Sequence, residues 1–164
     1  MIEFMRLNNK GFTLIEVLTV LVIISILGVI VVPNTMEVVK SGKKNTYKIL
    51  VANIKESAIN MYKELEYSDS ELYYYKDNKK EIINISDDNK LEINLASLVK
   101  NGFLTGDNVE EGSVINSVDN SDMGECRIVI TKKVDNNNYK VSYVIESIDN
   151  SNKCPTSSDY KEGV

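Results

Sequence analysis

The sequence of 164 residues contains no histidine and no tryptophan. Histidine is the side chain used most often as a general base near neutral pH and as a metal ligand, so its absence disfavours an enzyme. Arginine occurs only at positions 6 and 127, and the formal net charge is −5. An acidic chain lacks the broad basic surface that attracts nucleic acid. We therefore expect a non-enzymatic protein without a cofactor, a metal or a nucleic-acid partner.

Cysteine is also scarce, with one residue at Cys126 and one at Cys154. If this part of the chain is exported, such a pair favours a disulfide. Closing a loop of that length would stabilise the fold by about 3–4 kcal/mol on the chain-entropy model. Two free thiols are the alternative. Two cysteines without histidine do not make a zinc site.

Apolar residues dominate the segment 12–32, which is about 31 Å long as a helix and matches the hydrocarbon core of a bilayer. Arg6 and Lys10 precede it, which favours a cytoplasmic N-terminus and export of the rest. No A-x-A cleavage site follows, and Pro33 ends the segment, so it is not an ordinary secretory signal. Five residues interrupt the apolar run: Thr13, Glu16, Thr19, Ser25 and Gly28.

A carboxylate such as that of Glu16 costs about 3 kcal/mol or more inside a membrane helix, so its presence calls for a reason. The sequence GFTLIE at residues 11–16, after a short basic leader, resembles the prepilin signature of type IV pilins and pseudopilins. The resemblance implies that a prepilin peptidase cuts between Gly11 and Phe12 and methylates the new amine of Phe12. Glu16 then becomes the fifth residue, and Pro33 takes a position at which many type IV pilins have a helix-kinking proline.

Glu16 and Pro33 are the predicted assembly residues, and Glu16 is the one expected to set the register. In a filament, the charged amine of Phe12 from a neighbouring subunit would lie beside this carboxylate and fix the axial offset between subunits, since buried ion pairs set register better than they stabilise. The alternative is an incidental glutamate that reaches toward water. The small residues of the run, such as Gly28, permit close helix approach, but ordinary membrane-helix usage explains them equally well.

Apolar residues recur at helical spacing beyond the apolar run, on one face of residues 47–65. We predict one helix from residue 12 to residue 65, bent near Pro33. Residues 1–11 would be the leader, 12–33 the transmembrane and filament-core half of the helix, and 34–66 its amphipathic half. Four lysines at 40, 43, 44 and 48 form a solvated face or meet anionic headgroups. The predicted stripe consists of Tyr47, Val51, Ile54, Ala58, Met61 and Leu65.

Residues 67–164 are predicted to form a globular head that covers this stripe. Residues 66–90 are polar and form a loop with a short strand at 81–85. The tyrosines at 73–75 form an irregular strand packed on one side or, alternatively, an adhesive patch. Residues 95–104 form a short helix that stops at Gly102, because glycine accepts the conformation that ends helices.

The clearest strand signal is an antiparallel hairpin around the turn at 135–138, with alternating apolar residues on both sides. Pairing across that turn places Ile128 opposite Ile145 and Ile130 opposite Tyr143, which puts the apolar side chains on one face. The fold class is therefore α+β, and the resemblance implies a pilin fold, with a long N-terminal helix packed on a small antiparallel sheet. A disulfide from Cys126 to Cys154 would resemble the C-terminal disulfide loop of many type IV pilins.

Oxygen-rich segments at 119–122 and 135–138 raise the question of calcium. Neither has the spacing of an EF-hand loop, so solvated turns are the expected structure. Many pseudopilins bind calcium near the C-terminus where pilins have a disulfide, and the two cysteines favour the pilin.

The resemblance implies a structural subunit of a type IV pilus that serves adhesion, twitching motility or biofilm formation. Its partners would be the prepilin peptidase, other pilins in a homo- or hetero-polymer, and an assembly platform with a motor ATPase. It would be a single-pass membrane protein before assembly and a surface filament afterwards. A pseudopilin of a type II secretion or DNA-uptake machine, and a minor or tip pilin, are close alternatives. A membrane-tethered enzyme or receptor is a third, which no catalytic pattern supports.

Overall fold

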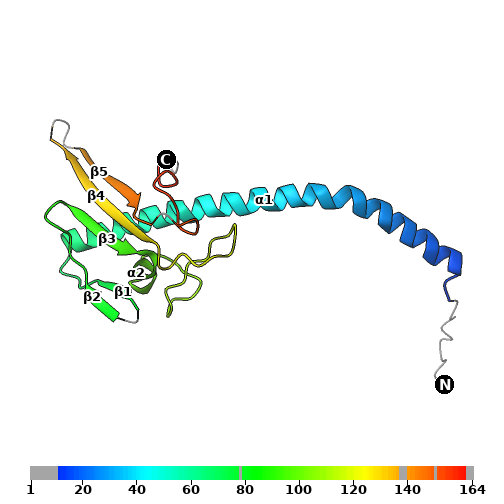
Figure 1. Ribbon diagram of the computed structural model, residues 1–164, viewed down its shortest axis with the longest axis horizontal. Coiled ribbons are helices and arrows are strands. Elements are labelled where there is room, and N and C mark those ends of the chain that lie inside the picture. The colour runs from blue at the N-terminus through cyan, green and yellow to red at the C-terminus, as the bar shows by residue number, and fades with distance from the viewer. Residues whose placement is uncertain (1–10, 78, 137–139, 150, 162–164) are drawn as a thin grey trace, which may run out of the picture. The chain divides into compact units, whose positions relative to one another are not determined.

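The computed structural model describes residues 11–77, 79–136, 140–149 and 151–161, and for residues 29–34 it describes the backbone alone. The chain divides into two units, residues 1–41 and residues 42–164. The fold is α+β, as predicted, with a long N-terminal helix followed by antiparallel strands in two small sheets (Figure 1). The elements are α1 (Leu14–Tyr67), β1 (Tyr73–Lys76), β2 (Lys79–Ile82), β3 (Lys90–Asn94), α2 (Leu95–Lys100), β4 (Arg127–Asp135) and β5 (Lys140–Ser147).

Helix α1 begins two residues later than predicted and also ends two residues later. Its backbone remains helical through Pro33, whose side chain lies outside the described residues. The bend near Pro33 stays a prediction. In the first unit, every described side chain between residues 11 and 28 is exposed.

In the second unit, the predicted stripe of α1 forms one wall of the core. Val51, Ile54, Ala58 and Met61 are buried, while the two ends of the stripe are half-buried. The neighbouring Tyr62 is also buried and contacts Tyr143 of β5, with the two ring centroids 5.5 Å apart in an edge-to-face arrangement. These contacts confirm that the helix stripe packs against the sheet.

The larger sheet has the strand order β3-β4-β5, with both pairs antiparallel. Its inward row consists of Leu91, Ile130 and Ile145, which lie directly opposite one another and are buried. The predicted hairpin register was wrong by two residues, because Ile128 pairs with Ser147 and Ile130 pairs with Ile145. The connection joins Asp135 to Lys140, one residue later than predicted. A shift of two preserves the faces, so the apolar side chains still share the inner side.

The smaller sheet is the hairpin of β1 and β2. The strand predicted at residues 81–85 begins instead at Lys79 and ends at Ile82, because it pairs with the tyrosine strand through a short turn. Tyr74 packs against the core, whereas Tyr73 and Tyr75 point to the opposite face. The tyrosine segment is therefore a strand packed on one side.

Helix α2 is shorter than predicted and ends at Lys100. Gly102 follows the C-cap residue Asn101 with a φ of +81° and donates its N–H to the Val99 carbonyl oxygen, so it is the predicted stop. The long loop after α2 packs closely on the helix. A Cβ at Gly112, where φ is +75°, would lie 2.7 Å from the Cβ of Ala96, so no larger residue fits there.

Candidate processing and assembly site

The N-terminus of α1 is closed by Thr13 and Glu16. The Thr13 N–H donates to Glu16 Oε2 at 2.8 Å, and the Thr13 hydroxyl donates to the same oxygen at 2.9 Å. In return, the Glu16 N–H donates to Thr13 Oγ1 at 3.3 Å. These reciprocal bonds are a capping box, in which the side chains at both ends of the first turn satisfy free backbone groups.

The capping box gives Glu16 a local partner that the sequence interpretation had missed. The T-x-x-E pattern of residues 13–16 is the usual capping-box signal before an apolar run, so it could have been found. The same bonds start the helix at Leu14 and leave Gly11 and Phe12 outside it. The two residues of the predicted scissile bond are thus exposed and non-helical.

Apolar side chains cover the helix surface after the cap. Phe12 is 85% exposed and Leu21 is 59% exposed, and their apolar neighbours up to Leu27 are all about half exposed or more. Contiguous apolar surface on this scale marks contact with a membrane or with other protein chains.

The hydroxyl groups in this surface are satisfied within the helix. Thr19 donates to the Ile15 carbonyl oxygen at 2.8 Å, and Ser25 donates to the Leu21 carbonyl oxygen at 2.7 Å. Such bonds to the preceding turn remove the need for a polar partner outside the helix. Among the described residues, no helix has the length and apolarity required to cross a membrane.

A comparison with known protein families identifies the segment that carries this surface. Residues 6–32 match the prokaryotic N-terminal methylation motif. The chain carries the type IV prepilin signature. The matched residues include Gly11 and Phe12, predicted for processing, and Glu16, predicted for assembly, and they end just before Pro33. The signature indicates a structural protein of the type IV pilin or pseudopilin type. No curated protein and no solved structure matches the chain.

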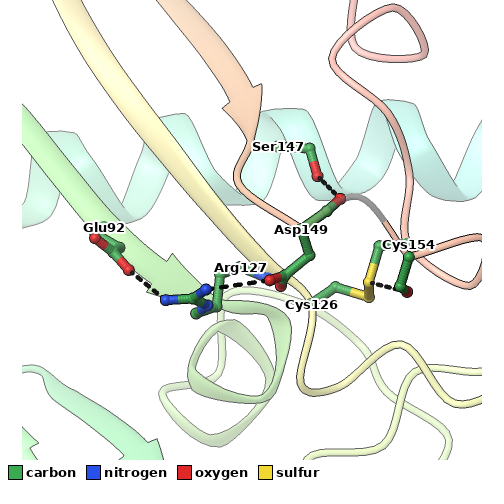
Figure 2. Close-up of polar contacts among 7 residues, drawn as sticks. Glu92, Cys126, Arg127, Ser147, Asp149 and Cys154 are labelled. Carbon is green, nitrogen blue, oxygen red and sulfur yellow. Dashed lines mark hydrogen bonds and ion pairs between the residues drawn. A yellow bond between two sulfur atoms is a disulfide. The ribbon is translucent and has the colours of Figure 1, made fainter.

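The two cysteines that follow the prepilin signature in sequence form a disulfide. Cys126 and Cys154 are bonded with their Cα atoms 5.5 Å apart (Figure 2). Beside them, the Arg127 guanidinium pairs with Asp149 and with Glu92, each at 3.2 Å. Hydrogen bonding to Asp149 raises the pKa of Arg127, which remains charged. The disulfide and the Arg127–Asp149 pair together hold the C-terminal tail to the start of β4.

The oxygen-rich segment at 119–122 uses its carboxylates for its own loop. Asp119 Oδ1 accepts from the Ser121 N–H at 3.0 Å, and Asp122 Oδ1 accepts from the N–H groups of Val114 and Gly124. The bonds from Ser121 lower the pKa of Asp119. In the described part of the chain, no three His, Cys, Asp or Glu side chains are grouped to hold a metal.

A polar ladder on α2 holds the hairpin, and nothing in the sequence interpretation anticipated it. Asn101 Oδ1 accepts from the Tyr73 N–H at 3.1 Å, while its Nδ2 donates to the Tyr73 carbonyl oxygen at 2.7 Å. Ser97 Oγ accepts from the Tyr75 N–H at 2.9 Å, and Asn94 Nδ2 donates to the Tyr75 carbonyl oxygen at 2.7 Å. The i, i+3, i+7 spacing of these three polar residues places them on one side of α2 and its two caps, but this spacing does not reveal which backbone groups they bind.

Proposed function

We propose that the chain is a structural subunit of a type IV pilus. Cleavage by the prepilin peptidase falls between Gly11 and Phe12, and Phe12 becomes the methylated N-terminus. The observation that carries this proposal is the methylation motif at residues 6–32, whose apolar helix surface is exposed in the isolated chain. A lone subunit leaves that surface without a partner, and a membrane or a bundle of copies supplies one.

The proposed life of the subunit has two stages. Residues 12–33 first anchor the precursor as a single membrane span with a cytoplasmic N-terminus, and the head is exported. An assembly platform with its motor ATPase then moves the subunit into a helical bundle. This transfer costs little because apolar surface of neighbouring subunits replaces lipid around the same side chains.

Glu16 fits both stages. Its bonds to Thr13 use Oε2, and no described residue bonds to Oε1. We propose that Oε1 accepts from the amine of Phe12 in a neighbouring subunit. The capping box holds the carboxylate in place for that contact, and the ion pair selects one axial offset between subunits.

Two measurements on native material test the proposal. Mass spectrometry is expected to find a methylated Phe12 at the N-terminus, and electron microscopy with an antibody to residues 67–164 is expected to find surface fibres. A processed terminus without fibres would instead identify a pseudopilin. An intact leader would refute the processing step.

Two substitutions separate processing from assembly. Gly11→Ala is expected to abolish maturation, because the peptidase must approach the backbone closely at this residue. Glu16→Ala is expected to leave processing intact and to block or strongly reduce polymerisation. Normal filaments from Glu16→Ala cells would contradict the register argument.

A further inference from the structure

Asn101 is the one asparagine of the chain that a glycine follows. Such a pair is chemically labile, because the glycine N atom can attack the side-chain amide when no side chain obstructs its approach. A bond forms from Gly102 N to Asn101 Cγ while the Cγ–Nδ2 bond breaks, and the nitrogen leaves as ammonia with the proton of the Gly102 N–H. Water then opens the cyclic imide at either carbonyl group, which gives aspartate or isoaspartate without any other reactant.

The folded head holds both reacting groups in place. Asn101 Oδ1 accepts from the Tyr73 N–H at 3.1 Å, and Nδ2 donates to the carbonyl oxygens of Tyr73 and Ser97, each at 2.7 Å. The Gly102 N–H donates to the Val99 carbonyl oxygen at 3.0 Å. Attack therefore requires the amide to leave Tyr73 and the Gly102 N–H to leave Val99.

Water reaches this pair without crossing the core. Gly102 is exposed and Asn101 is half-buried. A Cβ at Gly102 would have no atom within 4 Å apart from its chain neighbours. Hydrolysis of the imide is thus open to solvent, and the reaction is limited by the ordered amide and backbone rather than by a lack of water.

The bonds that hold Asn101 belong to the attachment of the β1–β2 hairpin, which lies beside α2 in Figure 1. Tyr73 is the first residue of β1. Two residues on, the Tyr75 N–H donates to Ser97 Oγ at 2.9 Å, and the Tyr75 carbonyl oxygen accepts from Asn94 Nδ2 at 2.7 Å. Asn94 and Ser97 are fully buried, so water reaches them only when β1 leaves α2. Release of Asn101 is therefore coupled to opening of the hairpin.

The product of the reaction cannot restore this attachment. Aspartate at position 101 has no Nδ2 donor, so the carbonyl oxygens of Tyr73 and Ser97 lose this donor and face a carboxylate instead. A buried acceptor that loses its partner costs more than the hydrogen bond itself contributes. A hairpin that has opened and reacted is therefore expected to stay open.

We propose that Asn101 is a self-modification site whose reaction is gated by the β1–β2 hairpin. The amide persists while the hairpin is attached to α2, and it converts to a carboxylate only while the hairpin is open. The conversion makes a transient opening permanent and adds a negative charge to the head. This inference concerns the head alone, and its success or failure leaves the proposed pilus subunit unaffected.

Deamidation of the full chain in detergent micelles tests the gate. The chain is incubated at mildly alkaline pH with and without a denaturing concentration of urea, and peptide mapping by mass spectrometry follows the gain in mass at Asn101. We expect conversion in urea to be at least about tenfold faster than in the folded chain, because only the open fraction reacts. Equal rates in the two conditions would overturn the proposal.

Two serine substitutions show whether the hairpin is the gate. Ser97→Ala removes the hydroxyl that accepts from Tyr75 and leaves the side-chain bonds of Asn101 in place. It should raise the rate in the folded chain about fivefold through more frequent opening. Ser147→Ala is the matched control, because it removes a hydroxyl bond in the other sheet and should leave the rate unchanged. Equal rates in the two variants would overturn the gate.

Hydrogen exchange supplies an independent measure of opening. Ser97→Ala should speed exchange at the amides of Tyr73 and Tyr75 by the same factor as it speeds deamidation. Slow exchange at Ile130, in the core of the larger sheet, verifies that the head remains folded. Faster exchange at the two tyrosines without faster deamidation would contradict the coupling and overturn the proposal.

The effect of the product is measured with Asn101→Asp. This variant should exchange the amides of Tyr73 and Tyr75 about tenfold faster, because the attachment has lost its donor. Asn53→Asp is the matched control, since it makes the same change of charge at an exposed position of α1 and should leave the protection unchanged. Unchanged protection in Asn101→Asp, or an equal loss in both variants, would overturn the claim that conversion keeps the hairpin open.

Discussion

Two stretches of α1 differ in how their apolar side chains are arranged and exposed. In residues 14–28 they surround the helix and are exposed, whereas in residues 47–65 most of them occupy one stripe that the head covers, with Ile49 exposed. A stripe is the pattern of a helix that finds its partner within its own chain, and an apolar surface all round is that of a helix whose partner lies outside it. The comparison shows that one element packs within the head along one stretch and exposes apolar surface along the other.

The largest expected effect comes from placing the same charge in each stretch. Ile54→Asp buries an unpaired carboxylate in the core and should prevent folding of the head, because such a group costs several kcal/mol. Leu21→Asp should leave the thermal unfolding of the head unchanged and abolish filaments. Circular dichroism of the detergent-solubilised chain and microscopy of cells measure the two outcomes. Equal destabilisation by both substitutions would remove the distinction.

Removing the disulfide should affect only the head. The double substitution Cys126→Ala and Cys154→Ala is expected to lower the free energy of unfolding by about 3–4 kcal/mol, because the unfolded chain regains the entropy of the closed loop. Urea unfolding followed by tyrosine fluorescence measures the change. Prepilin cleavage of the same variant serves as the control and should proceed at the wild-type rate.

Loss of the capping box should weaken only the start of α1. Thr13→Ala removes the hydroxyl that bonds to Glu16 and should cost about 1 kcal/mol of local helix stability. Hydrogen exchange in micelles is expected to show faster exchange at residues 14–17 alone. Thr13→Ser is the matched control, because serine keeps the hydroxyl and should keep the protection.

The smallest effect concerns alkaline pH and the head. Burial, with the charge of Asp159, raises the pKa of Tyr47 to about 12. The folded state therefore keeps this hydroxyl neutral while the unfolded chain ionises near pH 10, so stability should fall as pH rises from about 10 to 12. The loss should stay below about 1 kcal/mol because solvent screens a partly exposed group. Tyr47→Phe should flatten this part of the curve. An unchanged curve for Tyr47→Phe would assign the dependence to another group, such as the buried Tyr160.

Periodicity was sufficient to predict only part of the core, because it did not reveal β3 with its buried Leu91 and Ile93, and it was insufficient for pairing and polar detail. The stripe from Tyr47 to Leu65 and the inward faces of β4 and β5 follow from spacing alone, because burial repeats at 3.6 or 2 residues. The hairpin register depended on where a polar turn begins, and several asparagines in a row leave that position open.

In the candidate site too, local patterns could be predicted from the sequence and contacts between distant segments could not. The prepilin signature is a local pattern, so Gly11, Phe12 and Glu16 could be named from the sequence. The ladder of Asn94, Ser97 and Asn101 could not, because its bonding partners lie about 20 to 30 residues earlier in the chain and the hairpin that holds them was not predicted. Contacts between distant segments depend on the assembled fold, which residue spacing does not determine.

The ladder on α2 has a consequence for sequence variation. Asn94, Ser97 and Asn101 bond to backbone N–H and carbonyl groups of β1. These bonds do not involve the side chains of β1. The side chains at positions 73 and 75 can therefore be exchanged without loss of these four backbone bonds. A surface mounted in this way can acquire new partners by substitution while its scaffold stays the same.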